Sequence, residues 1–215
     1  MDLELRQRFS VGAFDLAWDE WGSGSGAPLV IVHGFGGSAF DFASQIAALA
    51  ANRRVLAIEL RGHGRSSKSS DLESYTIDHI VDDLAAWLPT VVDEPIHLLG
   101  HSMGGRVSMR FGFIRRDLVR SMILANTTAW KFDIANSVIH EKRLRFFRSI
   151  QPDTPMGTPE SAETALIMAA NPPEMLARRR EVNDSLDPMA CKALGLALFD
   201  DGLQPIDHLL GDIDA

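Results

Sequence analysis

The sequence predicts an α/β fold, with a mostly parallel sheet that carries helices on both faces. Two observations predict it. In the first 126 residues, short apolar segments alternate with segments whose apolar residues recur at helical spacing, the order typical of parallel strands joined by crossover helices. After residue 126 only helical patterns remain, so an all-helical insertion is expected there.

The predicted strands differ in how their apolar residues are arranged. Residues 14–21 (FDLAWDEW) alternate apolar and polar side chains, as a half-buried strand does. Four further segments are predominantly apolar, which suits strands that are buried on both faces of a parallel sheet. They are residues 28–32, 54–60, 95–99 and 120–126. Two strand-like segments precede the first of these four, so the last of them is the sixth strand.

Three helices are predicted between these strands. The first covers residues 40–51. The second begins after Thr76, whose hydroxyl can cap it, and the third follows Ser102. The apolar residues that mark one face are Ile77, Ile80, Val81, Leu84 and Leu88 in the second helix, and Val107, Phe111, Ile114 and Leu118 in the third.

The expected organisation is an α/β-type core in residues 1–126, a helical lid in residues 127–207, and a short segment, residues 208–215, that returns toward the core. The lid region contains several prolines at positions where helices are expected to begin. Its large apolar side chains are expected to pack the lid on the core or to line an apolar pocket. They are Trp130, Phe132, Phe146, Phe147, Met168, Met175, Met189 and Phe199.

Composition excludes several classes of protein. The chain has a formal net charge of -8, with 29 acidic and 21 basic residues, which argues against nucleic acid or an anionic membrane surface as partner. Cys191 is the only cysteine, so an intrachain disulfide is not possible. The first residues lack the pattern of a signal peptide, and no apolar run is long enough to cross a membrane. A soluble, cytoplasmic protein is therefore expected.

A serine between two glycines is the strongest candidate for chemistry. Residues 100–104 read Gly-His-Ser-Met-Gly, directly after an apolar strand and directly before a helix. This is the context of a nucleophile elbow, a tight turn that exposes the serine hydroxyl, although a plain Gly/Ser turn is the alternative. Gly100 and Gly104 are needed because the neighbouring backbones come close, and the helix start provides N–H groups for a developing oxyanion. Ser102 is therefore the candidate nucleophile.

A second glycine-rich segment, HGFGG in residues 33–37, also follows an apolar strand. Its backbone can supply the other half of an oxyanion hole, in which the N–H groups of Phe35 and Met103 bind the oxyanion. Gly34 and Gly36, on either side of Phe35, allow this backbone to curve around a carbonyl oxygen. Such chemistry needs neither a cofactor nor a metal.

Other patterns compete with this interpretation. Residues 34–39 also fit the G-x-G-x-x-A pattern of a dinucleotide-binding turn, with Glu59 as the ribose-binding acid. That fold gives no reason for the serine elbow two strands later and usually begins with its glycine-bearing strand, so it is disfavoured. His97 and His101 have the spacing of a helical metal pair, but they lie at a strand end and no metal site is expected. His63 is expected to be a loop histidine rather than a base.

Three segments in this order resemble the α/β-hydrolase fold family: PLVIVHGFGG, VLAIELRGHGRSS and IHLLGHSMGGRV. They are similar to its oxyanion strand, the following strand and the nucleophile strand. With the helical insertion after SMILANTTA, the resemblance covers nearly the whole chain. It implies a serine hydrolase that acts on a small carboxylic ester or lactone through an acyl-enzyme on Ser102. ANTTAW and the lid pattern are similar to small lidded esterases, enol-lactonases and C–C bond hydrolases.

The resemblance also implies a Ser–His–acid triad, in which the acid follows the lid on the next strand and the histidine lies near the C-terminus. The sequence stops at HLLGDIDA, where that strand is about to begin, so acid and base are expected in a missing portion of two strand–helix units. His208 and Asp212 come too early to replace them, and the 215-residue chain alone is expected to be nearly inactive. C–C bond hydrolysis and perhydrolysis remain alternatives, as does a non-catalytic binding or receptor-like module on the same fold.

Overall fold

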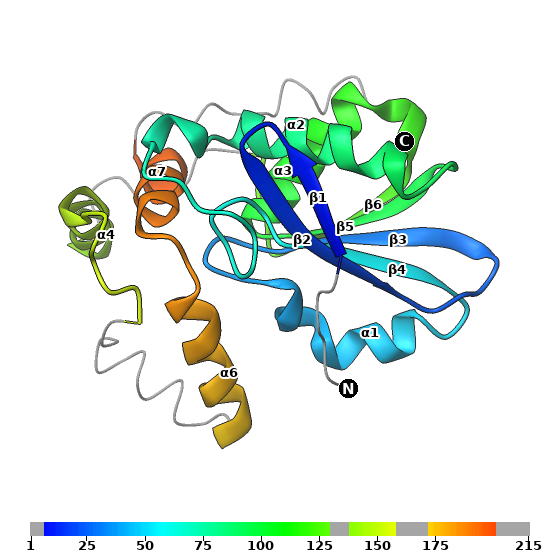
Figure 1. Cartoon of the computed structure of the whole chain (residues 1–215), viewed down its shortest axis with the longest axis horizontal. Coiled ribbons are helices and arrows are strands. Elements are labelled where there is room, and N and C mark those ends of the chain that lie inside the picture. The colour runs from blue at the N-terminus through cyan, green and yellow to red at the C-terminus, as the bar shows by residue number, and fades with distance from the viewer. Residues whose placement is uncertain (1–6, 130–137, 158–171, 201–215) are drawn as a thin grey trace.

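The computed structural model describes residues 7–129, 138–157 and 172–200, and its centre is a six-stranded sheet in the order β1-β2-β4-β3-β5-β6 (Figure 1). The strands are β1 (Gln7–Val11), β2 (Phe14–Trp21), β3 (Gly26–Val32), β4 (Arg53–Ile58), β5 (Ile96–His101) and β6 (Val119–Ala125). β2 is antiparallel to both β1 and β4, whereas β4, β3, β5 and β6 pair in parallel. The mostly parallel sheet predicted from the sequence is confirmed.

Helices cover both faces of this sheet, also as predicted. The three helices between the strands are α1 (Ala43–Leu49), α2 (Ile77–Trp87) and α3 (Met103–Ile114). α2 and α3 lie on one face, and α1 lies on the other (Figure 1). Successive side chains of a strand point to opposite faces, and β3 shows the division. Its Val30 and Val32 join the apolar core beneath α2 and α3, whereas Leu29 and Ile31 join the core beneath α1.

Local sequence signals account for several helix boundaries. The Thr76 hydroxyl caps α2, as expected, by accepting a hydrogen bond from the His79 N–H at 3.0 Å. The helix expected at residues 40–51 is instead a 3₁₀ turn, η1 (Ala39–Phe42), followed by the short α1. The apolar face predicted for α3 is wrong at Ile114, which is 59% exposed, because the helix ends at this residue and the chain then leaves the helical path.

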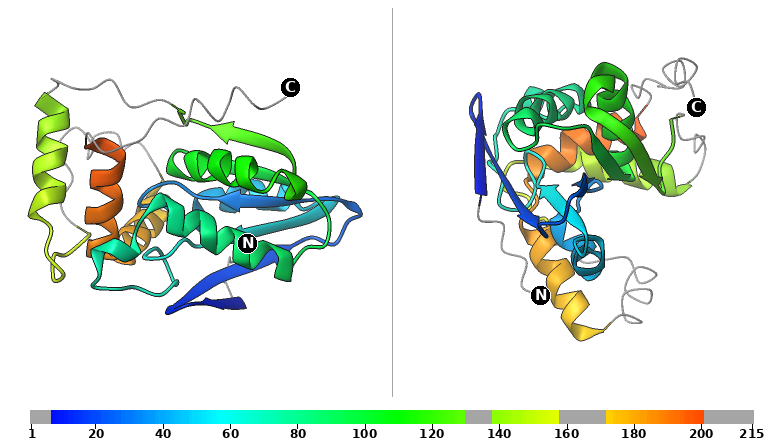
Figure 2. Two further views of the ribbon diagram at one scale, coloured as in Figure 1. Left: turned by 90° about the horizontal axis from the view of Figure 1, so that it is seen from above. Right: turned by 90° about the vertical axis from the view of Figure 1, so that its right-hand side faces the viewer.

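Three described helices follow β6. They are α4 (Val138–Ser149), α6 (Pro173–Asp184) and α7 (Pro188–Phe199). They gather at one end of the sheet, and α4 packs against α7 (Figures 1 and 2). α6 and α7 begin with a proline, where the missing N–H costs no intrahelical hydrogen bond.

The described part of the chain contains no strand after β6, which agrees with the helical character expected there. None of the described helices is long and apolar enough to cross a membrane. The predicted return segment, residues 208–215, lies outside the described residues.

Candidate active site

Ser102 stands at the turn between β5 and α3 in a backbone conformation that few residues with a side chain adopt. Its φ is 51° and its ψ is -116°. Two contacts from the end of β6 hold it there. The Ser102 N–H donates to the Ala125 carbonyl at 2.9 Å, and the Thr127 hydroxyl donates to the Ser102 carbonyl at 2.7 Å. The neighbouring strand therefore stabilises the strained turn, and the serine stays only half-buried.

The packing of this turn requires the glycines on both sides of it. A side chain at Gly104 would overlap the carbonyl oxygen of His33, and a side chain at Gly100 would overlap the backbone of Gly104. The elbow therefore lies directly against the HGFGG segment that follows β3. A Cβ atom added to Gly34 would lie 3.2 Å from the Cβ of Ser102, so these two segments are in contact at the serine itself.

The N–H groups of Phe35 and Met103 are available to an oxyanion. Neither donates a hydrogen bond to another residue of the described chain. Met103 begins α3, so its N–H is among those that a helix start leaves without an intrahelical partner and with partial positive charge. Both residues line a small pocket with Ser102, of about 110 Å³, to which α7 contributes Leu198 and Phe199. The structure thus brings the three residues singled out in the sequence to one cavity.

The turn that carries Phe35 is held by hydrogen bonds on both sides of that residue. The Gly34 carbonyl lies 2.8 Å from the His33 Nδ1. The Gly36 N–H donates to the His63 Nε2 at 3.2 Å. Gly36 has a φ of 62°, which is favourable for glycine and strained for other residues. Two imidazoles therefore contact the main chain directly before and directly after Phe35.

His33 and His63 form a buried pair that the sequence analysis did not find. Their ring centroids lie 5.0 Å apart, and both rings are fully buried. Burial lowers the pKa of His33 to about 4 and the pKa of His63 to about 3, so both rings are neutral at neutral pH. His63 is a loop histidine, as expected. The one signal that could have paired them is their position beside glycines beyond the carboxyl ends of two adjacent strands, β3 and β4.

Among the described residues, no histidine ring is hydrogen-bonded to the Ser102 hydroxyl. His97 is bonded to the Ser121 hydroxyl at 2.7 Å, and His79 is exposed on α2. The residues weighed as substitutes for a base and an acid lie outside the described residues; they are His208 and Asp212. The described chain therefore presents a serine in one pocket with Phe35 and Met103, whose N–H groups have no partner there, and no histidine bonded to its hydroxyl.

The geometry does not support the alternatives that compete for these segments. Glu59 is buried and its carboxylate accepts the Arg65 N–H at 2.5 Å, so it faces its own loop rather than a ribose beside residues 34–39. His97 and His101 lie four residues apart on β5, which separates them by about 13 Å, too far to share a metal ion. No cluster of three metal-ligating side chains occurs in the described parts of the chain.

Aromatic side chains connect the helices after β6 to the pocket. Phe147 of α4 packs edge-on against Phe35 with ring centroids 5.8 Å apart, and it stacks on Phe199 of α7 at 5.7 Å. Phe147 is buried, and Phe199 lines the Ser102 pocket. These two residues therefore do what was expected of the aromatic side chains of this region. Three of the others lie outside the described residues: Trp130, Phe132 and Met168.

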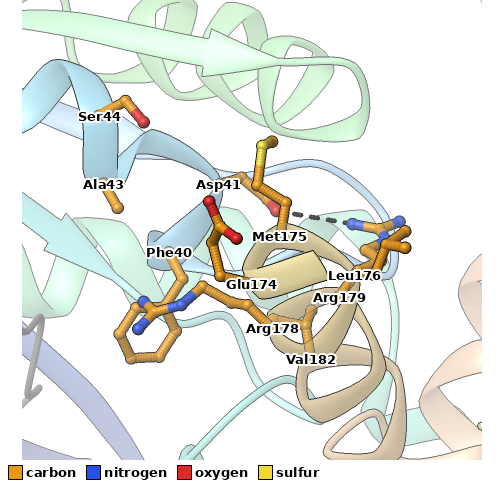
Figure 3. Close-up of a pocket in the computed structure, with 10 residues that line it drawn as sticks. All are labelled: Phe40, Asp41, Ala43, Ser44, Glu174, Met175, Leu176, Arg178, Arg179 and Val182. Carbon is orange, nitrogen blue, oxygen red and sulfur yellow. Dashed lines mark ion pairs between the residues drawn. The ribbon is translucent and has the colours of Figure 1, made fainter. Parts of the chain in front are cut away.

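A larger cavity, of about 480 Å³, lies between η1 and α6 (Figure 3). Three of its four charged side chains contact each other or an aromatic ring. Arg179 of α6 pairs with Asp41 at 3.5 Å, and the Arg178 guanidinium lies over the Phe40 ring at 4.6 Å. Ser102, Phe35 and Met103 do not line it. The cavity therefore marks the contact of α6 with the turn that follows HGFGG and is separate from the pocket that Ser102 lines.

A family model described as alpha/beta hydrolase fold matches residues 27–167, from β3 through the elbow and beyond α4. Among curated proteins, the chain is 41% identical over 118 residues to the dihydrolipoyllysine-residue acetyltransferase component of the acetoin cleaving system of Pseudomonas putida. That match covers 55% of this chain and 31% of the relative. The chain spans less than two fifths of the length of the first curated relatives that it matches.

Solved structures with the same arrangement include two enzymes. The chain superimposes on the enol-lactonase from Burkholderia xenovorans LB400 with a TM-score of 0.75 and 21% identity, over 97% of this chain and 78% of that one. It superimposes on a thermophilic esterase from Thermogutta terrifontis with a TM-score of 0.73 and 25% identity, over 95% of this chain and 75% of that one. The chain therefore shares its overall fold with both of these structures.

Proposed function

The chain belongs to the α/β-hydrolase fold family, and we propose that Ser102 is the nucleophile of a hydrolase that acts on a small carboxylic ester or lactone. The observation that carries this proposal is the placement of Ser102 and the N–H groups of Phe35 and Met103 around one pocket. A strained backbone at a half-exposed serine also supports it, because strain of this kind is concentrated at reacting residues.

The reaction divides into two acyl transfers. The Ser102 oxygen attacks the ester carbonyl while a base removes the hydroxyl proton, and the carbonyl π electrons move onto the oxygen. The Phe35 and Met103 N–H groups donate to this oxyanion. The C–O bond then breaks, the leaving alcohol takes the proton, and the acyl group remains on Ser102. Water repeats the sequence, releasing the acid and the free serine.

In this proposal, the base and the acid that orients it come from outside the described residues. A serine hydroxyl is a weak nucleophile at neutral pH until an imidazole within about 3 Å removes its proton. His33 and His63 are not candidates for this base, because both nitrogens of each ring are already hydrogen-bonded to backbone groups.

The pocket beside Ser102 favours a short acyl group. Its volume of about 110 Å³ is limited by Leu198 and Phe199, and Phe199 is itself held against Phe147. Because the stacked rings leave the α7 side of the pocket little room to widen, we expect acetyl and butyryl groups to fit and a long fatty acyl chain to be excluded.

The test of the proposal is Ser102→Ala in the full-length protein. We expect turnover of p-nitrophenyl acetate and butyrate to fall by about 10⁶, the scale for a triad nucleophile, with an unchanged circular dichroism spectrum and melt. Ser44→Ala is the matched control, because Ser44 lines the other cavity (Figure 3) and should leave turnover unchanged. Undiminished turnover in Ser102→Ala would refute the proposal.

A non-catalytic binding module is the second candidate, and it is favoured by the lack of a base bonded to Ser102 among the described residues. The two candidates differ in their reaction with a fluorophosphonate, which modifies only an activated serine. Rapid labelling at Ser102 supports the hydrolase. Retention of small esters in the pocket without labelling and without turnover supports the binding module.

A further inference from the structure

We infer that His63, together with His33, is a positioning residue of the oxyanion hole: the two imidazoles fix the peptide planes on either side of Phe35 and thereby aim its N–H. The inference rests on the proposed role of Ser102 and adds two residues to that site. Neither imidazole is required to touch the substrate, since each acts through the main chain.

The peptide between Gly34 and Phe35 is fixed through its carbonyl group. A trans peptide is planar, and its C=O and N–H point in opposite directions, so whatever holds the Gly34 carbonyl also sets the direction of the Phe35 N–H. The His33 Nδ1 lies 2.8 Å from this carbonyl oxygen, and the Gly37 N–H donates to the same oxygen at 3.0 Å. The Phe35 N–H therefore points to the opposite side, where it has no partner among the described residues.

The next peptide, which joins Phe35 to Gly36, is held by His63. Its N–H donates to the His63 Nε2 at 3.2 Å. The His63 Nδ1 lies 3.1 Å from the Arg61 carbonyl oxygen. A carbonyl can only accept a hydrogen bond, so the ring proton sits on Nδ1 and the Nε2 lone pair faces Gly36. The His63 ring can hold this peptide only in its neutral form.

His33 uses the same tautomer. Its Nδ1 proton is donated to the Gly34 carbonyl, and its Nε2 accepts the Leu60 N–H at 3.1 Å. The surroundings keep both rings uncharged. The titratable group near His33, apart from His63, is His101. The charged groups near His63 are Lys68 and Asp41. Only Asp41 among these favours a protonated ring, and it is outweighed by burial.

The loop that carries His63 also supports α7. The Asp187 N–H donates to the Gly62 carbonyl at 2.8 Å, and a side chain at Gly62 would overlap Ala190. A change at His63 could therefore disturb α7 as well as the oxyanion hole. The experiment must separate these two effects.

Two substitutions at position 63 separate them. His63→Leu removes the acceptor for the Gly36 N–H, whereas His63→Gln places an amide oxygen near the former Nε2. In the full-length protein we expect His63→Leu to lower kcat for p-nitrophenyl acetate by about 10- to 100-fold, with KM changed by less than about threefold, since a donor is misaligned rather than removed. His63→Gln should recover most of kcat. Rates are expressed per active site, and the active sites are titrated with a fluorophosphonate. An unfolded fraction of the protein therefore does not lower the measured kcat.

The ratio of the ester rate to the rate on the matching thionoester distinguishes a misaligned oxyanion donor from a general loss of structure. A general loss of structure slows both substrates equally and leaves this ratio unchanged. The sulfur of the thionoester accepts hydrogen bonds poorly, so the oxyanion hole contributes less to its hydrolysis. His63→Leu is expected to slow the thionoester much less than the ester. Equal losses on both substrates, or an unchanged kcat, would overturn the inference. Turnover that survives Ser102→Ala would instead overturn the proposed function.

The tautomers can be tested in the wild-type chain without activity. Long-range ¹H–¹⁵N spectra of protein labelled at histidine should show both buried rings neutral and protonated at Nδ1, down to about pH 5. An Nε2-protonated His63, or a ring that titrates near its ordinary value of about 6.5, would overturn the inference even if Ser102 proves to be the nucleophile.

Discussion

The oxyanion donors that we propose are main-chain groups, so in this proposal the side chains of Phe35 and Met103 do not decide whether an oxygen can be bound. The sequence must instead specify the residues that position these N–H groups. They are glycines where two backbone segments come close, and polar side chains that bind the neighbouring peptides. Gly104 meets the first need, since any side chain there would overlap the backbone of Val32 and His33 at the end of β3. His33 and His63 meet the second.

The same two histidines predict how stability depends on pH. Their pKa values in the folded state, about 4 for His33 and about 3 for His63, lie below the unfolded value of about 6.5. Between these limits the unfolded chain takes up protons that the folded chain does not. The unfolding free energy is therefore unaffected above about pH 7 and falls as pH drops through about 6.5. We expect a loss of about 2 kcal/mol per histidine between pH 7.5 and 5, measured by urea unfolding.

His63→Gln is the control for this prediction, because glutamine does not titrate and should lose the share of the pH dependence that belongs to His63. Burial raises the pKa of the Glu59 and Asp83 carboxyls, so these two groups change the unfolding free energy with pH in the opposite direction. Both are present in the wild type and in His63→Gln, so their contributions cancel in the comparison. An identical pH dependence in the two proteins would contradict the prediction.

At the scale of the elements, apolar patterning predicted the sheet because strands covered by helices on both faces must be apolar along their length. β2 covers residues 14–21 as expected, and the ends of β3, β4, β5 and β6 differ from expectation by at most two residues. Thr76 marks the start of α2 for a local reason, a hydroxyl that reaches the backbone three residues later. Signals of this kind are contained in a short window of sequence.

Contacts between distant windows could not be predicted in this way. The His33–His63 pair depends on the adjacency of β3 and β4. The residues next to either histidine in the sequence do not indicate that this adjacency brings the two rings together. The bond from Thr127 to the Ser102 carbonyl likewise requires β6 to lie beside β5. For the candidate site, the sequence pointed to Ser102 and to the backbone of Phe35 and Met103, which line one pocket, while the side chains that contact their neighbours appear only once the sheet is assembled.

The position of α7 gives a prediction at this scale. Asp187 caps the helix, since its carboxylate accepts the Ala190 N–H at 2.9 Å, while its own N–H is bonded to Gly62. Asp187→Ala removes the cap and keeps the backbone bond, so we expect the unfolding free energy to fall by about 1 kcal/mol in urea denaturation at pH 7.5. Asp187→Asn retains a capping oxygen and should restore most of the loss. A loss as large in Asn as in Ala would show that the carboxylate charge, rather than the cap, matters.

At the scale of the whole molecule, the site depends on strand order. The three chain segments that build it follow β3, β4 and β5, which are neighbours in the sheet although their sequences are separated by whole helices. Parallel strands end at the same edge, so the loops after them meet there. The helices after β6 gather at this end of the sheet (Figure 2). There α7 contributes Leu198 and Phe199 to the lining of the Ser102 pocket.

The other consequence of strand order lies at the sheet edge. In the described chain β6 pairs only with β5, so its outer edge is open. Ile123 and Leu124 are 49% and 41% exposed, and as successive residues of a strand they point to opposite faces. Each face of β6 thus presents an exposed apolar side chain beside unpaired main-chain groups, a combination that favours pairing with a second chain.

We therefore expect the 215-residue chain to self-associate in a concentration-dependent manner, and Leu124→Lys to shift it toward monomer, because a charge on an open edge opposes pairing. Sedimentation velocity at several concentrations measures the shift. Ile114→Lys is the matched control, since Ile114 is more exposed than Leu124 but lies at the end of α3, away from the edge. If the two lysine variants reduce association equally, general hydrophobicity rather than the strand edge is responsible. A wild-type chain that stays monomeric at every concentration contradicts the prediction outright.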